Sequence, residues 1–190
     1  EEREILQGLN FMVRIRDPLH GTVQLTGLEE RLLDTPQMQR LRGIRQLAMA
    51  YLVYPGANHT RFEHSIGTLF LADKICRELG ISEEKTAAVR AAALLHDVGH
   101  TAFSHEAEAV LIAHLGTHEQ IGEKMIANGE IADILSESFS PKEIAALAHS
   151  PLGEIISSDI GADRMDYLLR DSHYTGVAYG MIDSDRICST

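Results

Sequence analysis

The sequence predicts a mainly α-helical domain, an irregular helical bundle that follows a short N-terminal β element. Three observations lead to this fold class. Most of the chain shows the apolar spacing of amphipathic helices, extended alternation is confined to one stretch near the N-terminus, and no repeat of fixed period occurs. The strand content is too low for an α/β sheet. The 190 residues contain no linker-like tract, so we expect one domain over residues 1–190.

The β element is predicted over residues 13–25, VRIRDPLHGTVQL. Apolar residues alternate with polar ones on both sides of Asp17-Pro18 and Gly21, which are typical turn residues. Two short strands joined by a turn are therefore expected.

The helices are predicted in order from their caps and their apolar spacing. The first has Asp34 as its N-cap and runs through the segment 36–50, before an apolar piece that stops at Pro55-Gly56. The others are expected at 61–80, at 83–97 with Ser82 as N-cap and Gly99 as the stop, at 104–115, at 119–127, from a capping box at 140–143, and at 161–170.

Composition and charge exclude several classes of function. A net charge of −11 argues against general nucleic-acid binding, which needs a basic surface. No apolar run approaches the roughly 20 residues of a membrane helix, and no secretory signal is visible. Two cysteines without CxxC spacing indicate free thiols in a reducing compartment. We therefore expect a soluble, cytoplasmic protein in which a metal ion or a few arginines attract any anionic substrate.

Histidines are concentrated in one part of the chain. Seven of the ten fall between residues 59 and 118. A solitary histidine on an apolar helix face is usually structural. His96 and Asp97, however, follow the apolar run AAALL, where two polar groups are costly unless they are paired or bind a ligand. Both can reach one ion if the helix ends there, as Gly99 suggests.

Two further residues complete a candidate metal site. His64 supplies an imidazole from a separate predicted helix, and Asp163 supplies a carboxylate from the last one. Two imidazoles and two carboxylates suit one divalent Fe, Mn, Zn, Co or Ni ion, and four ligands leave positions open for water and a phosphate oxygen. Open positions indicate catalysis.

The order of motifs adds a family resemblance. NHTRFEHS, LLHDVGHTAFSHEAE, GTHEQ and GADRMDYLLRDSHYTG, together with IRDPLHG and DTPQMQRLR, resemble the HD-domain deoxynucleoside triphosphate triphosphohydrolases, the type of the mammalian SAM-and-HD-domain enzyme and its prokaryotic relatives. The resemblance extends from Ile15 to about Gly176. It implies an HD-type helical bundle that hydrolyses a dNTP to deoxynucleoside and inorganic triphosphate, with Mg²⁺ accompanying the nucleotide.

The resemblance also implies roles for individual residues. The metal ligands are His64, His96, Asp97 and Asp163, the general acid is His118, and its acidic partner is Glu108, an aspartate in the family. His100, His105 and Arg61 line the phosphate groove, and Gln46, Tyr167 and Asp171 contact the nucleoside. On the ground of charge, Arg164 can join Arg61 in offsetting the triphosphate. Asp34, Gln39 and Arg42 match the family's site for an activating nucleotide between subunits, although a lysine expected near the first strand is Val13 here. A homo-oligomer, dimer or tetramer, is implied.

Ordinary structural roles remain open for several of these residues. Gln46 can be a helix-surface residue and Tyr167 a core residue. Arg40, Arg42 and Arg45 can form a solvated face with Glu29 and Glu30. His114 and His149 are expected to face solvent.

Two other classes of function are alternatives. One is another HD-superfamily phosphohydrolase, such as a cyclic-dinucleotide phosphodiesterase, a guanosine-tetraphosphate hydrolase or a nucleotidase. HD-GYP phosphodiesterases show HDIGK and a GYP stretch, whereas this chain has His100 at the lysine position and no GYP. A second ion at His118 and His149 would indicate a dinuclear enzyme. The other class is a non-catalytic nucleotide-sensing domain, against which the intact ligand set argues. Since the chain stops soon after its last motif, we expect the domain to be incomplete at its C-terminus, and base preference stays open.

Overall fold

A computed structural model of the chain describes residues 11–189, apart from the side chains of residues 11, 12, 104–106, 108, 109 and 111. Its first elements are β1 (Phe11–Asp17) and β2 (Gly21–Thr26), which pair antiparallel. The turn is closed by Gly21 at a φ of 76° and by the Asp17 carboxylate, which accepts hydrogen bonds from the backbone N–H groups of Leu19 and His20, each at 2.9 Å. The predicted β element is confirmed.

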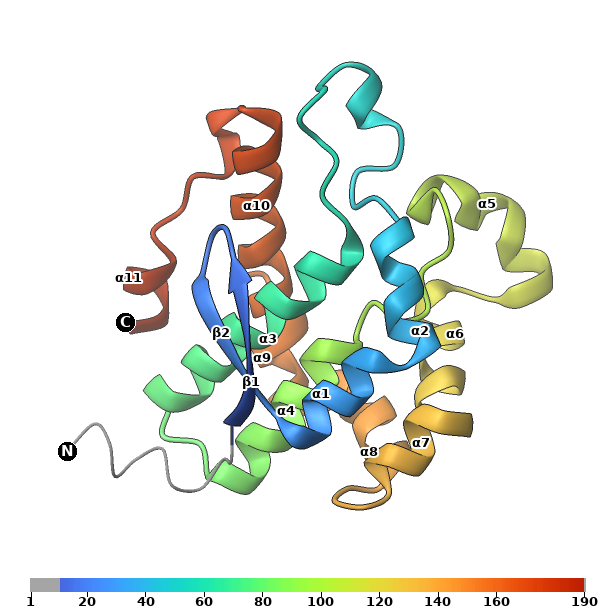
Figure 1. Ribbon diagram of the computed structural model, residues 1–190, viewed down its shortest axis with the longest axis vertical. Coiled ribbons are helices and arrows are strands. Elements are labelled where there is room, and N and C mark those ends of the chain that lie inside the picture. Colours follow the sequence, from blue (N-terminus) through green and yellow to red (C-terminus); the bar gives the residue numbers. More distant parts are fainter. Residues whose placement is uncertain (1–10, 190) are drawn as a thin grey trace.

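The rest of the described chain is mainly helical, as predicted (Figure 1). The α-helices are α1 (Gly27–Asp34), α2 (Pro36–Gln39), α3 (Arg61–Glu78), α4 (Glu83–Leu95), α5 (Ser104–Leu115), α6 (His118–Ile126), α7 (Gly129–Leu135), α8 (Pro141–Ala146), α9 (Glu154–Ser157), α10 (Ala162–Thr175) and α11 (Ser184–Ser189). Short 3₁₀ turns lie at Arg40–Gly43, Ala50–Leu52, Leu147–His149, Pro151–Gly153 and Ala178–Gly180.

Helix α3 forms the centre of the fold. It packs against α4 on one side and α10 on the other, and its residues Leu69, Leu71 and Ala72 are fully or almost fully buried. Helix α4 contributes an equally buried apolar stretch that ends with Leu94 and Leu95. Each such leucine stabilises the fold by about 1.5–3 kcal/mol. The three helices therefore give a rigid frame for side chains at their ends.

Most predicted helices are confirmed, with shifted ends. The helices at 61–80 and 104–115 correspond to α3 and α5, α4 ends at Leu95 rather than Asp97, and α10 continues beyond Arg170 to Thr175. Helix α6 begins at His118 because Thr117 forms a capping box with Gln120.

The predicted continuous helix over 36–50 is wrong. The N-cap is Thr35 and not Asp34, and α2 ends at Gln39, where a 3₁₀ turn replaces it. Arg45 then pairs with Thr60 in an isolated antiparallel bridge, which the backbone of a continuing helix could not form. The segment between Arg45 and Thr60 is a long loop that leads back to the start of α3.

One helix was missed by the prediction, and one predicted cap differs. Helix α1 was missed, although Thr26 and Glu29 form a capping box at its start. Glu29 is buried and accepts hydrogen bonds from Arg90 at 2.7 Å, so the proposed solvated face that included it is wrong. At Ser140 the helix begins as expected, but the side chain makes no capping hydrogen bond.

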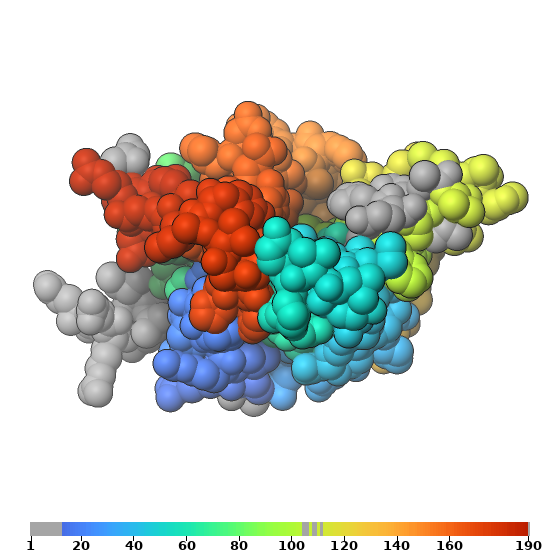
Figure 2. Space-filling view, turned by 90° about the horizontal axis from the view of Figure 1, so that it is seen from above, coloured from blue at the N-terminus to red at the C-terminus, as the bar shows by residue number. Residues whose placement is uncertain are grey.

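The loop before α3 lies against the end of α10. Figure 2 shows the segment around residue 55 beside the segment that follows residue 170. Gly56 makes this approach possible, because a Cβ there would lie 2.4 Å from the carbonyl oxygen of Tyr174. Among residues 11–189, no helix has the length and apolar character needed to cross a bilayer.

Candidate metal centre

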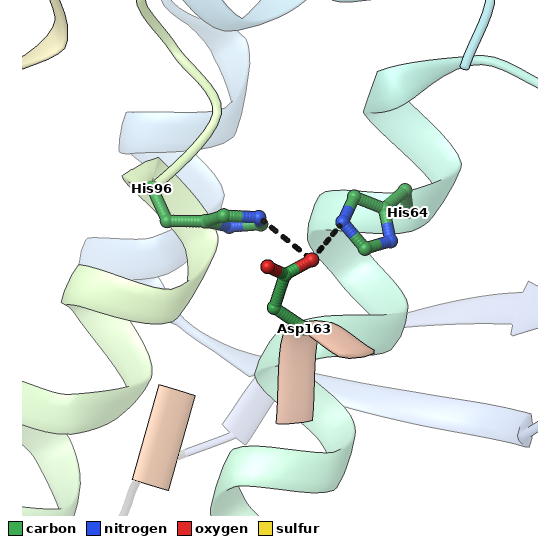
Figure 3. Close-up of side chains that lie close together, drawn as sticks. All are labelled: His64, His96 and Asp163. Carbon is green, nitrogen blue, oxygen red and sulfur yellow. Dashed lines mark hydrogen bonds and ion pairs between the residues drawn. The ribbon is translucent and has the colours of Figure 1, made fainter. Parts of the chain in front are cut away.

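Side chains from three helix ends converge at one point (Figure 3). His64 comes from the first turns of α3, His96 is the C-cap of α4, and Asp163 lies in the first turn of α10. Their ligand atoms all lie within 4.8 Å of one another. The Asp163 Oδ1 is 3.0 Å from His64 Nε2 and 3.8 Å from His96 Nε2. These three residues form a group that can hold a metal ion.

Asp97 lies beside this group. Its Oδ1 is 3.4 Å from His96 Nε2, and its Oδ2 is 3.8 Å from His64 Nε2. Adjacent residues in a continuing helix would diverge by about 100°, but α4 has already ended at Leu95. The four residues predicted as ligands from the sequence therefore lie together.

The hydrogen bonds of the two imidazoles fit metal ligation. His64 donates from Nδ1 to Asp166 at 2.7 Å, and His96 donates from Nδ1 to the carbonyl of Ala93 at 2.7 Å. Both rings therefore direct Nε2 toward the centre, as ligating histidines do when their other nitrogen is held by a carboxylate or a carbonyl. His96 Nε2 is buried and has no hydrogen-bond partner, a costly arrangement that a cation would relieve. The donor set fits a divalent ion.

The electrostatics of the cluster favour positive charge. Burial alone lowers the pKa of His64, but its hydrogen bonds to Asp163 and Asp166 outweigh burial and raise that pKa to about 10. Burial raises the pKa of Asp97, yet the nearby His96 and Arg61 hold it well below its usual range. The pKa of Asp163 is lowered as well, because its hydrogen bond with His64 outweighs the effect of burial. Without an ion, a proton on His64 balances the carboxylates.

A second set of residues, behind His64, was missed from the sequence. Asp166 accepts from His64 and also from His20 Nε2 at 2.6 Å, while Arg170 donates to Asp166 at 2.8 and 2.9 Å and to Asp17 at 3.0 Å. Asp166 and Arg170 are completely buried. Two signals were available: the spacing of Asp163, Asp166 and Arg170 places them on one helix face, and the DPLHG turn had a family match but no assigned role.

The predicted phosphate-groove residues that are described lie around Asp97. Arg61 is buried and donates to Asp97 Oδ2 at 2.6 Å, and His100 Nε2 lies 3.3 Å from Asp97 Oδ1. Burial lowers the pKa of His100 to about 4. Its ring stacks on His118, with centroids 4.0 Å apart. Gly99 permits this, because a Cβ there would lie 2.0 Å from the carbonyl oxygen of His118.

The predicted nucleoside-contacting residues lie on α10 and in the loop before α3. Tyr167 and Asp171 follow Asp163 at four-residue intervals and share its helix face. Asp171 is buried and accepts from His59 Nε2 at 2.8 Å. Gln46 lies in a turn, so its interpretation as a helix-surface residue is wrong, and its Oε1 is buried without a hydrogen-bond partner. Arg164, by contrast, is exposed and pairs with Asp159 at 3.1 Å.

The remaining predicted residues are placed as follows. The side chains of His105 and Glu108 lie outside the described residues. Asp34 is exposed at the end of α1, while Arg42 donates to Gln39 at 2.9 Å and stacks over the ring of Phe62.

His114 and His149 are exposed, as expected. His149 pairs with Glu123 at 2.8 Å. Among the described side chains, His118 and His149 belong to no group able to hold a second ion.

A cavity of about 210 Å³, lined by His96, Asp97, Asp163 and His118, opens between α6 and α8. Water and a phosphoryl-sized group can therefore reach the ligands.

A comparison with known protein families identifies the same residues as part of one domain. Residues 61–171 match the model of the HD domain, a stretch that covers more than half of the chain and contains His64, His96 and Asp163. The chain belongs to the HD-domain family. Among curated proteins, this chain is 48% identical over 175 residues, covering 91% of its length, to an uncharacterized protein of Methanocaldococcus jannaschii. It is 35% identical over 214 residues, covering 89% of the chain, to human deoxynucleoside triphosphate triphosphohydrolase SAMHD1.

Solved structures give the same result. A hypothetical protein from Aquifex aeolicus matches with a TM-score of 0.86 and 40% identity over 94% of this chain and 50% of its own. A phosphohydrolase from Bacteroides thetaiotaomicron matches with a TM-score of 0.81 and 35% identity over 93% of this chain and 45% of its own. The chain spans only 36% and 34% of the lengths of the two curated relatives.

Proposed function

We propose that this HD domain is a metal-dependent phosphohydrolase that converts a deoxynucleoside triphosphate to deoxynucleoside and inorganic triphosphate. The observation that carries the proposal is the convergence of His64, His96 and Asp163, with His96 Nε2 buried and without a hydrogen-bond partner. The choice of substrate is supported by the likeness to SAMHD1, which is named a deoxynucleoside triphosphate triphosphohydrolase. The likeness to the phosphohydrolase from Bacteroides supports the reaction class.

Asp97 is the fourth proposed ligand, since both of its oxygens face the histidine nitrogens. Two imidazole nitrogens and two carboxylate oxygens suit one divalent Fe, Mn, Zn, Co or Ni ion, with Mg²⁺ accompanying the nucleotide. When bound, such an ion polarises a phosphoryl oxygen and lowers the pKa of a water molecule. Four protein ligands leave room for both.

The reaction requires a proton donor for the leaving oxygen and positively charged groups beside the triphosphate. The oxygen of water bonds to the α-phosphorus while the bond to the 5′-oxygen breaks, and we assign His118 as the acid that protonates this oxygen, with Glu108 orienting it. His100 stacks on His118, and with its lowered pKa it is neutral at pH 7. His100 therefore holds His118 in place by stacking, and it carries no positive charge that would attract the phosphate away from His118.

Two arginines are assigned to the triphosphate. Arg61 is fixed at the cluster by its bond to Asp97. Arg164 forms an exposed pair with Asp159. Exposed pairs stabilise a fold by about 0–1 kcal/mol, so Arg164 can turn toward an anionic substrate at little cost. His105 completes this proposed phosphate groove.

The nucleoside is assigned to the α10 face and the loop before α3. The unpaired Oε1 of Gln46 can accept a hydrogen bond from the 3′-hydroxyl group, and Asp171, held by His59, can accept another. Tyr167 lies between Asp163 and Asp171 on the same helix face. We further propose that Asp34, Gln39 and Arg42 bind an activating nucleotide between subunits of a homo-oligomer.

Product analysis tests the proposal. The complete protein is stripped with a chelator, reconstituted with Mn²⁺ or Co²⁺, incubated with each of the four dNTPs, and its products are separated by anion exchange. Equal amounts of deoxynucleoside and inorganic triphosphate are expected, with none from His96→Ala. Orthophosphate, or cleavage of cyclic dinucleotides only, would assign a different phosphohydrolase activity. Nucleotide binding without turnover would indicate a sensing domain.

A further inference from the structure

One carboxylate joins the hairpin turn to a proposed metal ligand. The Nε2–H of His20 donates to Asp166 Oδ1 at 2.6 Å, and the Nδ1–H of His64 donates to Asp166 Oδ2 at 2.7 Å. Asp166 is completely buried, and the His20 side chain is 6% exposed. The β1–β2 turn therefore reaches His64 through a single side chain, from the side opposite to Nε2.

Both ends of this connection are fixed. The Asp17 carboxylate closes the turn by accepting from the backbone of Leu19 and His20, and its second oxygen accepts from Arg170 at 3.0 Å. Arg170 also donates to both oxygens of Asp166. The position of the turn and the orientation of the Asp166 carboxylate are consequently set by the same guanidinium group.

The surrounding helix is shaped to admit these groups. A Cβ at Gly67 would lie 1.9 Å from Asp166 Oδ1, so only glycine allows α3 to approach this carboxylate. The ring of His20 stacks on Phe70, with centroids 4.9 Å apart. His20 is therefore placed by packing as well as by its hydrogen bond, and substitutions can separate the two contributions.

We propose that His20 is a positioning residue of the metal centre: through Asp166 it sets the orientation of the His64 imidazole, and so the hairpin turn controls metal affinity. This inference rests on the proposed function, because it assumes that His64 binds the ion. A carboxylate that holds Nδ1–H fixes both the tautomer and the ring plane of a ligating histidine. Without His20, one oxygen of Asp166 is held by Arg170 alone.

Binding of Co²⁺ provides the test, with two substitutions of His20 that each remove either its hydrogen bond or its ring packing. His20→Phe keeps a planar ring against Phe70 but removes the N–H donor. His20→Gln keeps a donor near the position of Nε2. Loss of a residue behind a metal ligand typically weakens metal binding by about 10–100-fold, so we expect about a 10-fold higher Kd for Co²⁺ in His20→Phe and an altered visible absorption spectrum of the bound ion. His20→Gln should restore both.

A matched control separates positioning from stability. Arg90→Lys weakens the buried pair with Glu29 in another part of the core, and it should lower stability without changing Co²⁺ affinity or the spectrum. If the unsubstituted protein binds no Co²⁺, the proposed function fails. If it binds Co²⁺ and His20→Phe binds equally well, or His20→Gln is as weak as His20→Phe, only the positioning role of His20 is overturned.

A second measurement needs no variant, in case His20→Phe does not fold. A long-range ¹H–¹⁵N correlation spectrum of the zinc-loaded protein reports which nitrogen of each imidazole carries the proton. His20 should be protonated at Nε2, and His64 should be protonated at Nδ1 with a metal-bound Nε2. An unprotonated Nε2 on His20 would overturn the inference.

Discussion

Gly67 provides a quantitative test of how α3, α10 and the cluster are assembled. An added Cβ at this position would lie 1.9 Å from Asp166 Oδ1 and 2.4 Å from Arg170 Nη2. Both side chains are completely buried and bonded to each other, so neither can turn away into solvent. Gly67→Ala must therefore separate the helices or break the ion pair.

The expected loss follows from two opposing effects. Alanine is favoured over glycine in a helix by about 1 kcal/mol. Breaking a buried ion pair costs about 3–5 kcal/mol. The net loss in the free energy of unfolding is therefore about 2–4 kcal/mol, together with weaker metal binding, because Asp166 also holds His64.

Urea denaturation followed by circular dichroism measures this loss. Gly43→Ala is the matched control, since no atom lies within 4 Å of the added Cβ and the residue is exposed. Its effect should stay within about 0.5 kcal/mol. If Gly67→Ala is as stable as the unsubstituted protein and binds metal equally well, the described contact between α3 and α10 is wrong.

Two further predictions concern the cluster and the thiols. His96→Ala should abolish both bound metal and turnover, whereas His118→Ala should retain the metal, measured by atomic absorption, and lose about 10²–10⁴-fold in kcat; full activity of His118→Ala would refute its role as the acid. Burial raises the pKa of the Cys76 thiol to about 11, and Cys188 is only partly buried, so a thiol reagent at pH 8 should label Cys188 first, as followed by mass spectrometry, and equal labelling rates would contradict this order.

The helices that the sequence predicts well are those with long apolar periodicity and clear ends. Helix α3 begins at Arg61 as predicted, and α4 stops just before His96, which brings His96 and Asp97 together. The prediction failed where long-range contacts override local preference. The segment after Gln39 has helix-forming residues, but the guanidinium of Arg40 donates to the carbonyls of Val98 and His100, and Arg45 pairs with Thr60.

The candidate ligands could be predicted because an ion demands particular residue types. The residues that hold the ligands in place could not be predicted in the same way. Asp166 and Arg170 look like an ordinary i,i+4 pair on a helix surface, and only the packing of α10 on α3 shows that they are buried. His20 lies far from His64 in the chain, so its part in the cluster depends on where the hairpin turn docks.

The most direct measurement of the central claim is an anomalous difference map from crystals of the protein grown with Mn²⁺. We predict one strong peak at a distance of about 2.0–2.3 Å from the Nε2 atoms of His64 and His96 and from carboxylate oxygens of Asp97 and Asp163. A map without a peak among these four side chains, or with the ion bound elsewhere, would contradict the proposed metal centre and the hydrolysis assigned to it.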